Sequence, residues 1–340
     1  RVGSDWVGQF SIHAELSENT TDNEFVLRQP DGTTYRYHDF SGSKPSGGRL
    51  KSVTSAGDVT ATLTYDSSGR LTKFLQSRGA YSVIYDYNYS GGGSLPGGGL
   101  GLLRDVMLTI NETVVKRAVY SYYGLASEHG SYNDLEKVVI ERWRDSAWES
   151  IKTNYYRYWK GGEENENGEQ IGVSHGLKYI LDAAGYDKMV KAGYPPEADN
   201  GVELAKYASH YFEYNAERGV SQEVINGGQE EYSFQYESSN LPDGNNTWKT
   251  RTTETRPDGS EVIVYTNYAM GVILRILKSG NDQWYRYVEY ADNKYRAVKI
   301  ASSMAVASTN TPNANQALEV TLKDDEGLIT LKDWYDDDLN

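Results

Sequence analysis

The sequence predicts an all-β protein: an elongated antiparallel sheet of stacked β-hairpins with a short helical insertion. Tyrosine is unusually abundant, with 29 Tyr against 6 Phe, and tyrosine favours pleated, half-buried strands. The 34 glycines are typical of a chain with many turns. A strand–turn–strand pattern also recurs along the chain, which predicts a repeat array in which no unit buries its face alone.

Residues 1–29 are expected to form an N-terminal strand segment. Residues 5–12 alternate apolar and polar side chains, as a strand does. The chain opens with Arg1 rather than Met and has no charged-then-apolar leader. We therefore expect it to be a processed product or a piece of a longer protein.

Residues 30–181 are predicted to be hairpin repeats, and the clearest unit covers 63–72. Its core is Tyr65-Asp66-x-x-Gly69-Arg70-Leu71. The Asp66 carboxylate is expected to cap the turn, and Gly69 to take the positive φ that other residues resist. Arg70 and Leu71 begin the return strand.

Degenerate copies of this unit recur at uneven spacing on both sides of the predicted helical insertion. They cover 35–50, 83–103, 119–135, 156–177, 212–220, 264–273 and 287–298. The copy at 212–220 has Arg218-Gly219 where the clearest unit has Gly69-Arg70. The copies that follow the helical insertion form a second block of hairpins over 206–305.

Two regions depart from the repeat. Residues 182–205 predict one or two short helices, broken at Pro195-Pro196. Residues 306–340 are expected to be a C-terminal partial repeat, with a strand pair formed by segments near 318–322 and 328–331.

The Tyr65-Asp66-x-x-Gly69-Arg70-Leu71 motif resembles the YD repeat of bacterial RHS proteins, which are related to toxin-complex C components and to teneurins. The stretch from Trp248 to 267 is similar to the long degenerate repeats of large RHS proteins. The resemblance implies a β-sheet strip of YD-type hairpins that spirals and in some members closes into a hollow shell around a cargo. Self-cleaving members carry an Asp-Pro-x-Gly-x-x-Asp motif, which this sequence lacks.

Composition excludes several classes of function. The net charge of −14 argues against nucleic acid, which requires a basic surface. No apolar run approaches the ~18 residues of a membrane helix, so no membrane span is expected. There is no cysteine, which removes disulfide and thiolate chemistry.

No catalytic, cofactor or metal site is predicted, and the chain is expected not to be an enzyme. The five histidines, at 13, 38, 129, 175 and 210, do not have metal-ligand spacing. Glu141 and Glu289 lie near tryptophans and are the best-placed carboxylates for a glycosidase-like pair. Acidic runs at 324–326 and 336–338 could bind calcium weakly, although no spaced calcium loop is present.

The predicted function is structural: a segment of an RHS-type shell or fibre in a large protein that is secreted or displayed at the cell surface. The alternative is a carbohydrate-binding or adhesion module in which Trp143, Trp148 and Trp284 stack on glycan. A polysaccharide hydrolase is a third reading. The expected partners are a second copy or flanking repeats, paired through terminal strands in 5–12 and 327–335, together with an enclosed cargo or a glycan.

Overall fold

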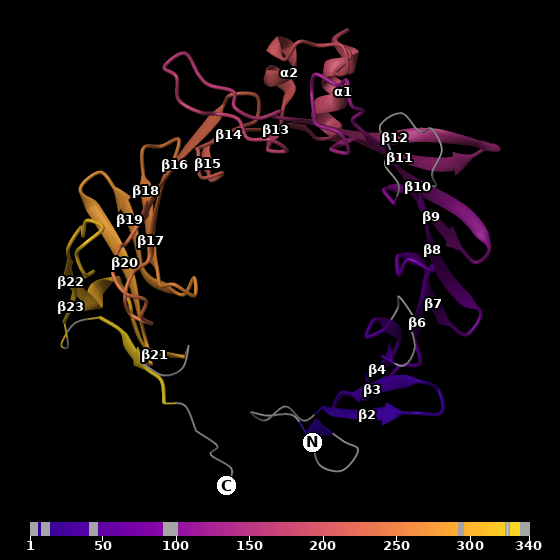
Figure 1. Ribbon diagram of the computed structural model, residues 1–340, viewed down its shortest axis with the longest axis horizontal. Coiled ribbons are helices and arrows are strands. Elements are labelled where there is room, and N and C mark those ends of the chain that lie inside the picture. Colours follow the sequence, from indigo (N-terminus) through magenta and orange to yellow (C-terminus); the bar gives the residue numbers. More distant parts are fainter. Residues whose placement is uncertain are drawn as a thin grey trace. The chain divides into compact units, whose positions relative to one another are not determined.

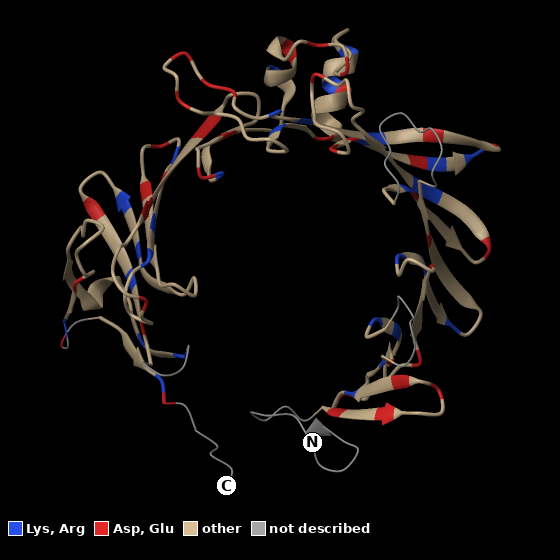
Figure 2. Ribbon diagram, in the orientation of Figure 1, with Lys and Arg blue, Asp and Glu red and all other residues tan. Residues whose placement is uncertain are grey.

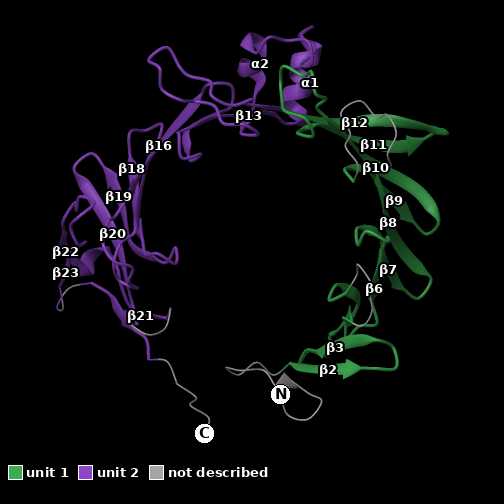
Figure 3. Cartoon of the chain, viewed as in Figure 1, with its two compact units in different colours: residues 1–156 green, residues 157–340 purple. Residues whose placement is uncertain are grey.

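The computed structural model describes residues 6–7, 14–40, 47–90, 101–291, 296–323, 325 and 327–333. The protein is mostly β-strand with two α-helices (Figure 1), so the predicted fold class is confirmed. The chain divides into two compact units, residues 1–156 and 157–340 (Figure 3).

Unit 1 is an antiparallel meander in which each strand pairs with the next along the chain. The N-terminal stretch predicted as a strand contributes β1, and the rest of 5–12 lies outside the described residues. The strands are β1 (Trp6–Val7), β2 (Glu15–Asn19), β3 (Glu24–Arg28), β4 (Thr34–His38), β5 (Leu50–Thr54), β6 (Thr60–Tyr65), β7 (Leu71–Arg78), β8 (Tyr81–Tyr89), β9 (Leu103–Ile110), β10 (Thr113–Tyr122), β11 (Leu135–Arg144) and β12 (Ala147–Tyr158), the last of which ends just past the unit boundary.

Unit 1 has few buried apolar side chains. Among its described residues, Val26, Tyr123 and Tyr155 are the buried hydrophobic ones. Most strand residues are half-buried, as expected for a sheet whose side chains mainly contact their cross-strand neighbours. Its stability therefore depends on pairing between hairpins more than on a closed core.

Unit 2 continues the same hairpin pattern with a second meander. Its strands are β13 (Leu177–Leu181), β14 (His210–Tyr214), β15 (Val220–Ile225), β16 (Glu230–Ser238), β17 (Thr250–Thr255), β18 (Glu261–Thr266), β19 (Val272–Ser279), β20 (Asp282–Tyr290), β21 (Ala297–Ala301), β22 (Val306–Thr309), β23 (Val320–Leu322) and β24 (Ile329–Leu331), with a 3-10 turn η1 (Ser303–Ala305) before β22.

The helical insertion consists of α1 (Ala183–Lys191) and α2 (Val202–Tyr207). Asp182 caps α1 by accepting a hydrogen bond from the Gly185 amide at 2.8 Å. The two helices pack on each other and on β13. Glycine is required at position 185, because a Cβ there would lie 2.3 Å from the Tyr207 carbonyl oxygen.

Unit 2 has a larger core, which its C-terminal segment completes. Trp248, Tyr265 and Leu274 are fully buried, and Leu318 and Val320 pack against them. The Trp248 indole donates to the Gln316 carbonyl at 2.8 Å. The segment after η1 therefore covers one face of the sheet.

The C-terminal strands form, but the expectation that they pair with each other is wrong. β23 pairs with β22 in a separate two-stranded sheet. β24 pairs instead with β21, with Ile300 opposite Thr330. The partners differ because 306–323 crosses the sheet face to cover Trp248 before the chain returns to the sheet edge.

Acidic and basic residues are interspersed along the strands of each unit (Figure 2). Several form cross-strand ion pairs, such as Lys299 with Glu289 at 2.7 Å and Lys278 with Glu261 at 3.0 Å. Much of the charge is therefore locally compensated, although the net charge is −14.

Candidate functional site

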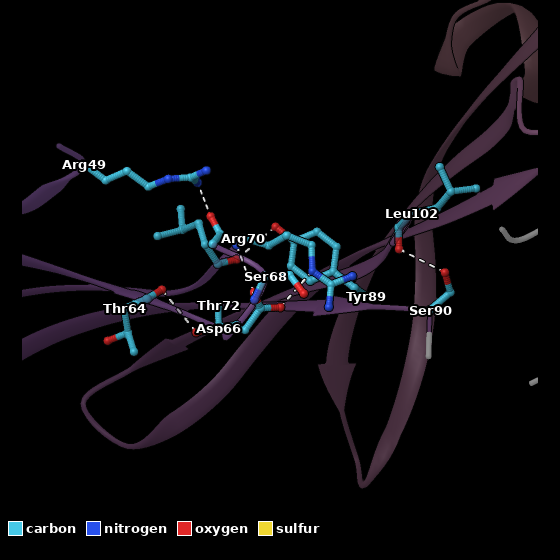
Figure 4. Close-up of polar contacts among 11 residues, drawn as sticks. Arg49, Thr64, Asp66, Ser68, Arg70, Thr72, Tyr89, Ser90 and Leu102 are labelled. Carbon is cyan, nitrogen blue, oxygen red and sulfur yellow. Dashed lines mark hydrogen bonds and ion pairs between the residues drawn. The ribbon is translucent and has the colours of Figure 1, made fainter. Parts of the chain in front are cut away.

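The turn that contains the YD-type motif lies between β6 and β7 (Figure 4). The Asp66 backbone amide donates to the Arg70 carbonyl at 2.9 Å, and the Gly69 amide donates to the Asp66 carbonyl at 2.9 Å. Gly69 has φ +78°, the left-handed conformation that glycine adopts at least cost. This is a short hairpin loop that ends in a left-handed residue.

The Asp66 carboxylate fixes this loop from inside. Its Oδ1 accepts from the backbone amides of Ser68 and Arg70, both at 2.9 Å, and its Oδ2 accepts from Arg70 Nε at 2.7 Å. The hydrogen bond from the Arg70 amide lowers the pKa of Asp66, and the Arg70 side chain lowers it further, although partial desolvation opposes both. Asp66 therefore remains an anion across the neutral range.

Arg70 connects this turn to the next hairpin. Its guanidinium carbon lies 4.6 Å from the centroid of the Tyr89 ring, a cation–π arrangement. On the other side, Arg49 donates to the Gly69 carbonyl (Figure 4). Arg49 occupies the position in the preceding hairpin that Arg70 occupies here, and it contacts the loop of the next hairpin.

The same irregularity recurs in seven hairpins. In each, the register shifts by a β-bulge immediately before the last residue of the outgoing strand that pairs with the return strand, and that residue is paired with the first residue of the return strand. The pairs are Tyr37–Leu50, Tyr65–Leu71, Tyr89–Leu103, Tyr122–Leu135, Tyr214–Val220, Thr266–Val272 and Tyr290–Ala297. The units identified as degenerate in sequence therefore share one backbone geometry.

A tyrosine hydroxyl bonds each of six hairpins to the hairpin before it. The hydroxyl donates to the backbone carbonyl of the first residue of an earlier return strand, over 2.7–3.1 Å. In unit 1 the pairs are Tyr65 with Leu50, Tyr89 with Leu71 and Tyr122 with Leu103; in unit 2 they are Tyr214 with Leu177, Tyr236 with Val220 and Tyr290 with Val272. We call this set of bonds the tyrosine ladder.

Three further turns reproduce the Asp66 arrangement with asparagine. Asn165 Oδ1 accepts from the amides of Asn167 and Glu169, both at 3.0 Å. Asn267 Oδ1 accepts from the amides of Ala269 and Gly271 at 3.1 and 2.8 Å. Asn215 Oδ1 accepts from the Gly219 amide at 2.8 Å. An amide oxygen can replace the carboxylate because the role is to accept backbone hydrogen bonds.

The structure brings two of the three predicted glycan-stacking residues together. Trp143 and Trp148 face each other across the β11–β12 hairpin, with ring centroids 5.1 Å apart and an interplanar angle of 64°. Trp143 is 41% exposed. Arg117 covers one face of Trp148, with its guanidinium carbon 4.3 Å from the ring centroid, and also forms an ion pair with Glu141.

Trp284 is not part of this pair. It is 46% exposed on β20 of unit 2, opposite Leu277. Glu289, considered with it from sequence, forms an ion pair with Lys299. The two carboxylates singled out for chemistry, Glu141 and Glu289, thus each face a cation.

The described histidines lie in strands or turns. The His38 ring contacts Tyr65 edge-on at 6.1 Å, and His210 stacks on Phe212 while its Nδ1 lies 2.9 Å from Glu223. His175 has φ +63° beside Gly176. Within the described ranges, no group of three His, Asp or Glu side chains is placed to hold a metal ion; of the acidic runs, Asp324, Glu326 and 336–338 lie outside them.

Sequence reasoning did not identify a groove in unit 1 of about 490 Å³, lined mainly by β9 and β10. Arg104, Asp105, Arg117, Tyr120 and Glu136 contribute to its lining. They are spread over three strands and share no motif, so only the sheet brings them together.

Comparisons with known proteins leave the family unassigned. The chain matches no protein-family model and no curated protein. Solved structures that resemble it include TcdB2-TccC3 without its hypervariable C-terminal region, with 11% identity, 85% of this chain and 17% of that chain covered, and a TM-score of 0.27. Another is a porin-like protein from Bacteroides uniformis ATCC 8492, with 10% identity, 85% and 86% of the two chains covered, and a TM-score of 0.25. Likenesses this distant carry no argument about function. None of the helices described is long and apolar enough to cross a membrane.

Proposed function

We propose that this chain is a structural segment of a YD-repeat scaffold, which forms part of a shell or fibre in a large secreted or surface-displayed protein. The observation that carries the proposal is the tyrosine ladder. Because the same bond joins six hairpins to the hairpins before them, a sheet strip can be extended by adding hairpins without adding a closed core. The RHS relationship inferred from the Tyr65–Leu71 motif belongs to this proposal.

Terminal strands provide the route of extension. Among the described residues, β24 pairs with β21 alone, and its Leu331 is 71% exposed. An unpaired strand edge presents amide and carbonyl groups that can pair with a further strand. Flanking repeats of the same protein or a second copy are the partners that we propose for this edge and for the N-terminal strand segment.

Electron microscopy and sedimentation of the purified chain test the scaffold. We expect fibres or shell-like particles whose formation depends on concentration. A variant with Ile329→Pro, which removes a backbone donor from β24, is expected to abolish assembly while leaving the far-ultraviolet circular dichroism spectrum unchanged. A wild-type chain that stays a monomer at high concentration would contradict assembly through this edge.

We also propose that the chain has no catalytic centre, since Glu141 and Glu289 are engaged in ion pairs with Arg117 and Lys299. A screen against glycan, peptide and ester substrates is expected to give no turnover. Turnover that is lost on a single substitution in the protein would overturn this part of the proposal.

A further inference from the structure

We propose that Tyr179 and Tyr211 of unit 2 form an oxidation site, where a one-electron oxidant joins the two rings into a dityrosine cross-link. The two residues lie directly opposite each other in the register of β13 and β14. The chain has 29 tyrosines and no cysteine, so no disulfide can fix these strands covalently. A dityrosine bond is the cross-link that the side chains offer at this position, and its function is separate from the scaffold role.

The two rings are in contact across the strands. Their centroids lie 4.8 Å apart with an interplanar angle of 38°, at the short end of the separations that aromatic pairs adopt. Trp159 meets the Tyr211 ring edge-on at 6.2 Å, and its indole nitrogen donates to the Phe212 carbonyl at 2.8 Å. The Tyr211 ring is therefore held against Tyr179, and a bond between ring carbons needs no change in strand pairing.

A pocket gives small molecules access to both rings. Tyr179, Tyr211 and Val224 form a row across β13, β14 and β15, because each is paired with the next. All three line an open pocket of about 240 Å³, to which α2 and the turn after β15 contribute Ala205 and Gly228. The register thus places both tyrosines on the face of the sheet that this pocket exposes, and a peroxide or an inorganic radical fits a space of this size.

The surroundings of the two hydroxyl groups provide for the protons that oxidation releases. The Tyr211 hydroxyl donates to Glu213 Oε1 at 2.7 Å. The Tyr179 hydroxyl has no hydrogen-bond partner among the described residues, yet it is not one of the buried polar atoms that lack a partner, so water in the pocket reaches it. Burial raises the pKa of both tyrosines, and the hydrogen bond and charge of Glu213 raise that of Tyr211 further. Both are therefore phenols at neutral pH, and Glu213 is placed to accept the Tyr211 proton as the electron leaves.

The reaction removes two electrons and two protons in all. Each tyrosine gives one electron to the oxidant and its phenolic proton to a base, Glu213 for Tyr211 and water for Tyr179, which leaves two phenoxyl radicals. The radicals combine through a carbon–carbon bond between ring positions next to the oxygens, and the hydrogens displaced from those carbons restore the two phenols. Hydrogen peroxide, acting in one-electron steps, takes up the two electrons and two protons and becomes two molecules of water.

Tyr123 and Tyr155 of unit 1 provide an internal comparison. Their hydroxyl groups lie 3.1 Å apart, but the two residues are only 4% and 1% exposed. Because neither ring is open to a dissolved oxidant, we expect this pair to remain unlinked under conditions that link Tyr179 to Tyr211.

Oxidation of the intact chain at low protein concentration tests the proposal, with persulfate and a light-activated ruthenium complex as the source of one-electron oxidant. We expect mass spectrometry to identify a cross-linked peptide that contains Tyr179 and Tyr211 and lacks two hydrogen atoms, and the protein to gain dityrosine fluorescence. The linked protein is expected to unfold at a temperature about 5–10 °C higher than the unlinked protein, because the bond restricts the unfolded chain.

Matched variants separate this site from general oxidation of tyrosine. Tyr179→Phe is expected to abolish the cross-linked peptide. Glu213→Gln is expected to slow its formation about tenfold, since an amide is a far weaker base than a carboxylate. Tyr81→Phe is the control, because Tyr81 is 52% exposed and lies in unit 1, and it is expected to leave the yield of the cross-linked peptide unchanged.

Three outcomes would overturn the oxidation site. These are dityrosine formed at other positions with none between Tyr179 and Tyr211, a link between Tyr123 and Tyr155 that forms at the same rate, or an unchanged rate in Glu213→Gln. Matching circular dichroism spectra before oxidation show that the variants are folded. The assembly experiment uses no oxidant, so failure here is distinct from failure of the scaffold.

Discussion

The left-handed residue of each YD-type turn differs from hairpin to hairpin. Gly69 occupies it with φ +78°, whereas Met270 and Arg218 occupy the equivalent place with φ +62° and +67°. The hydrogen bonds around them are the same: the Met270 amide donates to Asn267 and the Gly69 amide to Asp66. A residue with a Cβ is strained there by roughly 1–2 kcal/mol.

Met270→Gly is expected to raise the free energy of unfolding by about 0.5–1 kcal/mol, because relief of the strain exceeds the entropy cost of glycine. Met270 is 70% exposed, so little packing is lost. Urea unfolding measures the change. The reverse substitution, Gly69→Met, serves as the control and is expected to destabilise; an equal effect of both in the same direction would contradict the argument.

Glu24 is a buried carboxylate in unit 1, with a side chain only 2% exposed. It accepts hydrogen bonds from Lys51 at 2.9 Å and from Arg36. Burial raises its pKa, but the hydrogen bonds and charges of Lys51 and Arg36 outweigh burial, and the net shift is downward. The ionised form is therefore favoured in the folded state.

Because the pKa of Glu24 is lower in the folded state than in the unfolded state, its ionised carboxylate stabilises the fold. This stabilisation is fully present above the unfolded pKa of about 4.3. It is lost as pH falls through the folded pKa. Glu24→Gln is expected to cost about 1–2 kcal/mol at pH 7, with the difference from wild type shrinking below pH 4. Urea unfolding from pH 3 to pH 7 measures it. A difference that does not change with pH would show that the charge of Glu24 is not what stabilises the sheet.

In the hairpins, the tyrosine ladder explains why tyrosine rather than phenylalanine occupies six of the 29 tyrosine positions. A phenyl ring could fill the same position on the pleated surface, but only the hydroxyl reaches the carbonyl of the preceding hairpin. The acceptors are first residues of strands, such as Leu71 and Leu103, whose carbonyls lie beside a bulged turn.

Tyr89→Phe and Tyr122→Phe are each expected to lower the free energy of unfolding by about 0.5–1.5 kcal/mol, the net contribution of one hydrogen bond. Tyr120→Phe is the matched control, since its hydroxyl has no partner among the described residues, and is expected to change stability by less than about 0.5 kcal/mol. Equal losses from Tyr120 and Tyr122 would contradict a specific role for the ladder.

At the scale of the whole chain, the ladder couples stability to alkaline pH. Burial raises the pKa of Tyr65, Tyr122, Tyr214, Tyr236 and Tyr290 above the usual value near 10. Between the unfolded and folded pKa values, the folded state holds more protons than the unfolded state. The free energy of unfolding must therefore fall as pH rises through this interval.

Full stability is expected below pH 10, with a steep loss above it as several tyrosines ionise together on unfolding. Unfolding midpoints from pH 8 to pH 12, with tyrosinate absorbance recorded in parallel, measure this. The Tyr122→Phe variant is expected to show a shallower loss. Tyrosine ionisation complete near pH 10 without loss of structure would contradict the coupling.

Features that depend on neighbours within a few residues can be predicted from the amino-acid sequence alone. The hairpin at 63–72 follows from Asp66, Gly69 and Arg70, because the bonds that close it join residues at most four apart. The helices in the insertion follow in the same way from a capping residue such as Asp182.

Contacts between distant segments depend on how the strands pair in three dimensions. The ladder bonds join residues 15 to 37 positions apart, and Trp248 meets Gln316 across 68 positions. Nothing local specifies these partners, since each depends on which strand lies alongside. The groove on β9 and β10, the Arg117 contact with Trp148 and the pairing of β24 with β21 have the same origin: sheet register fixes them, and register is set by the pairing of whole strands.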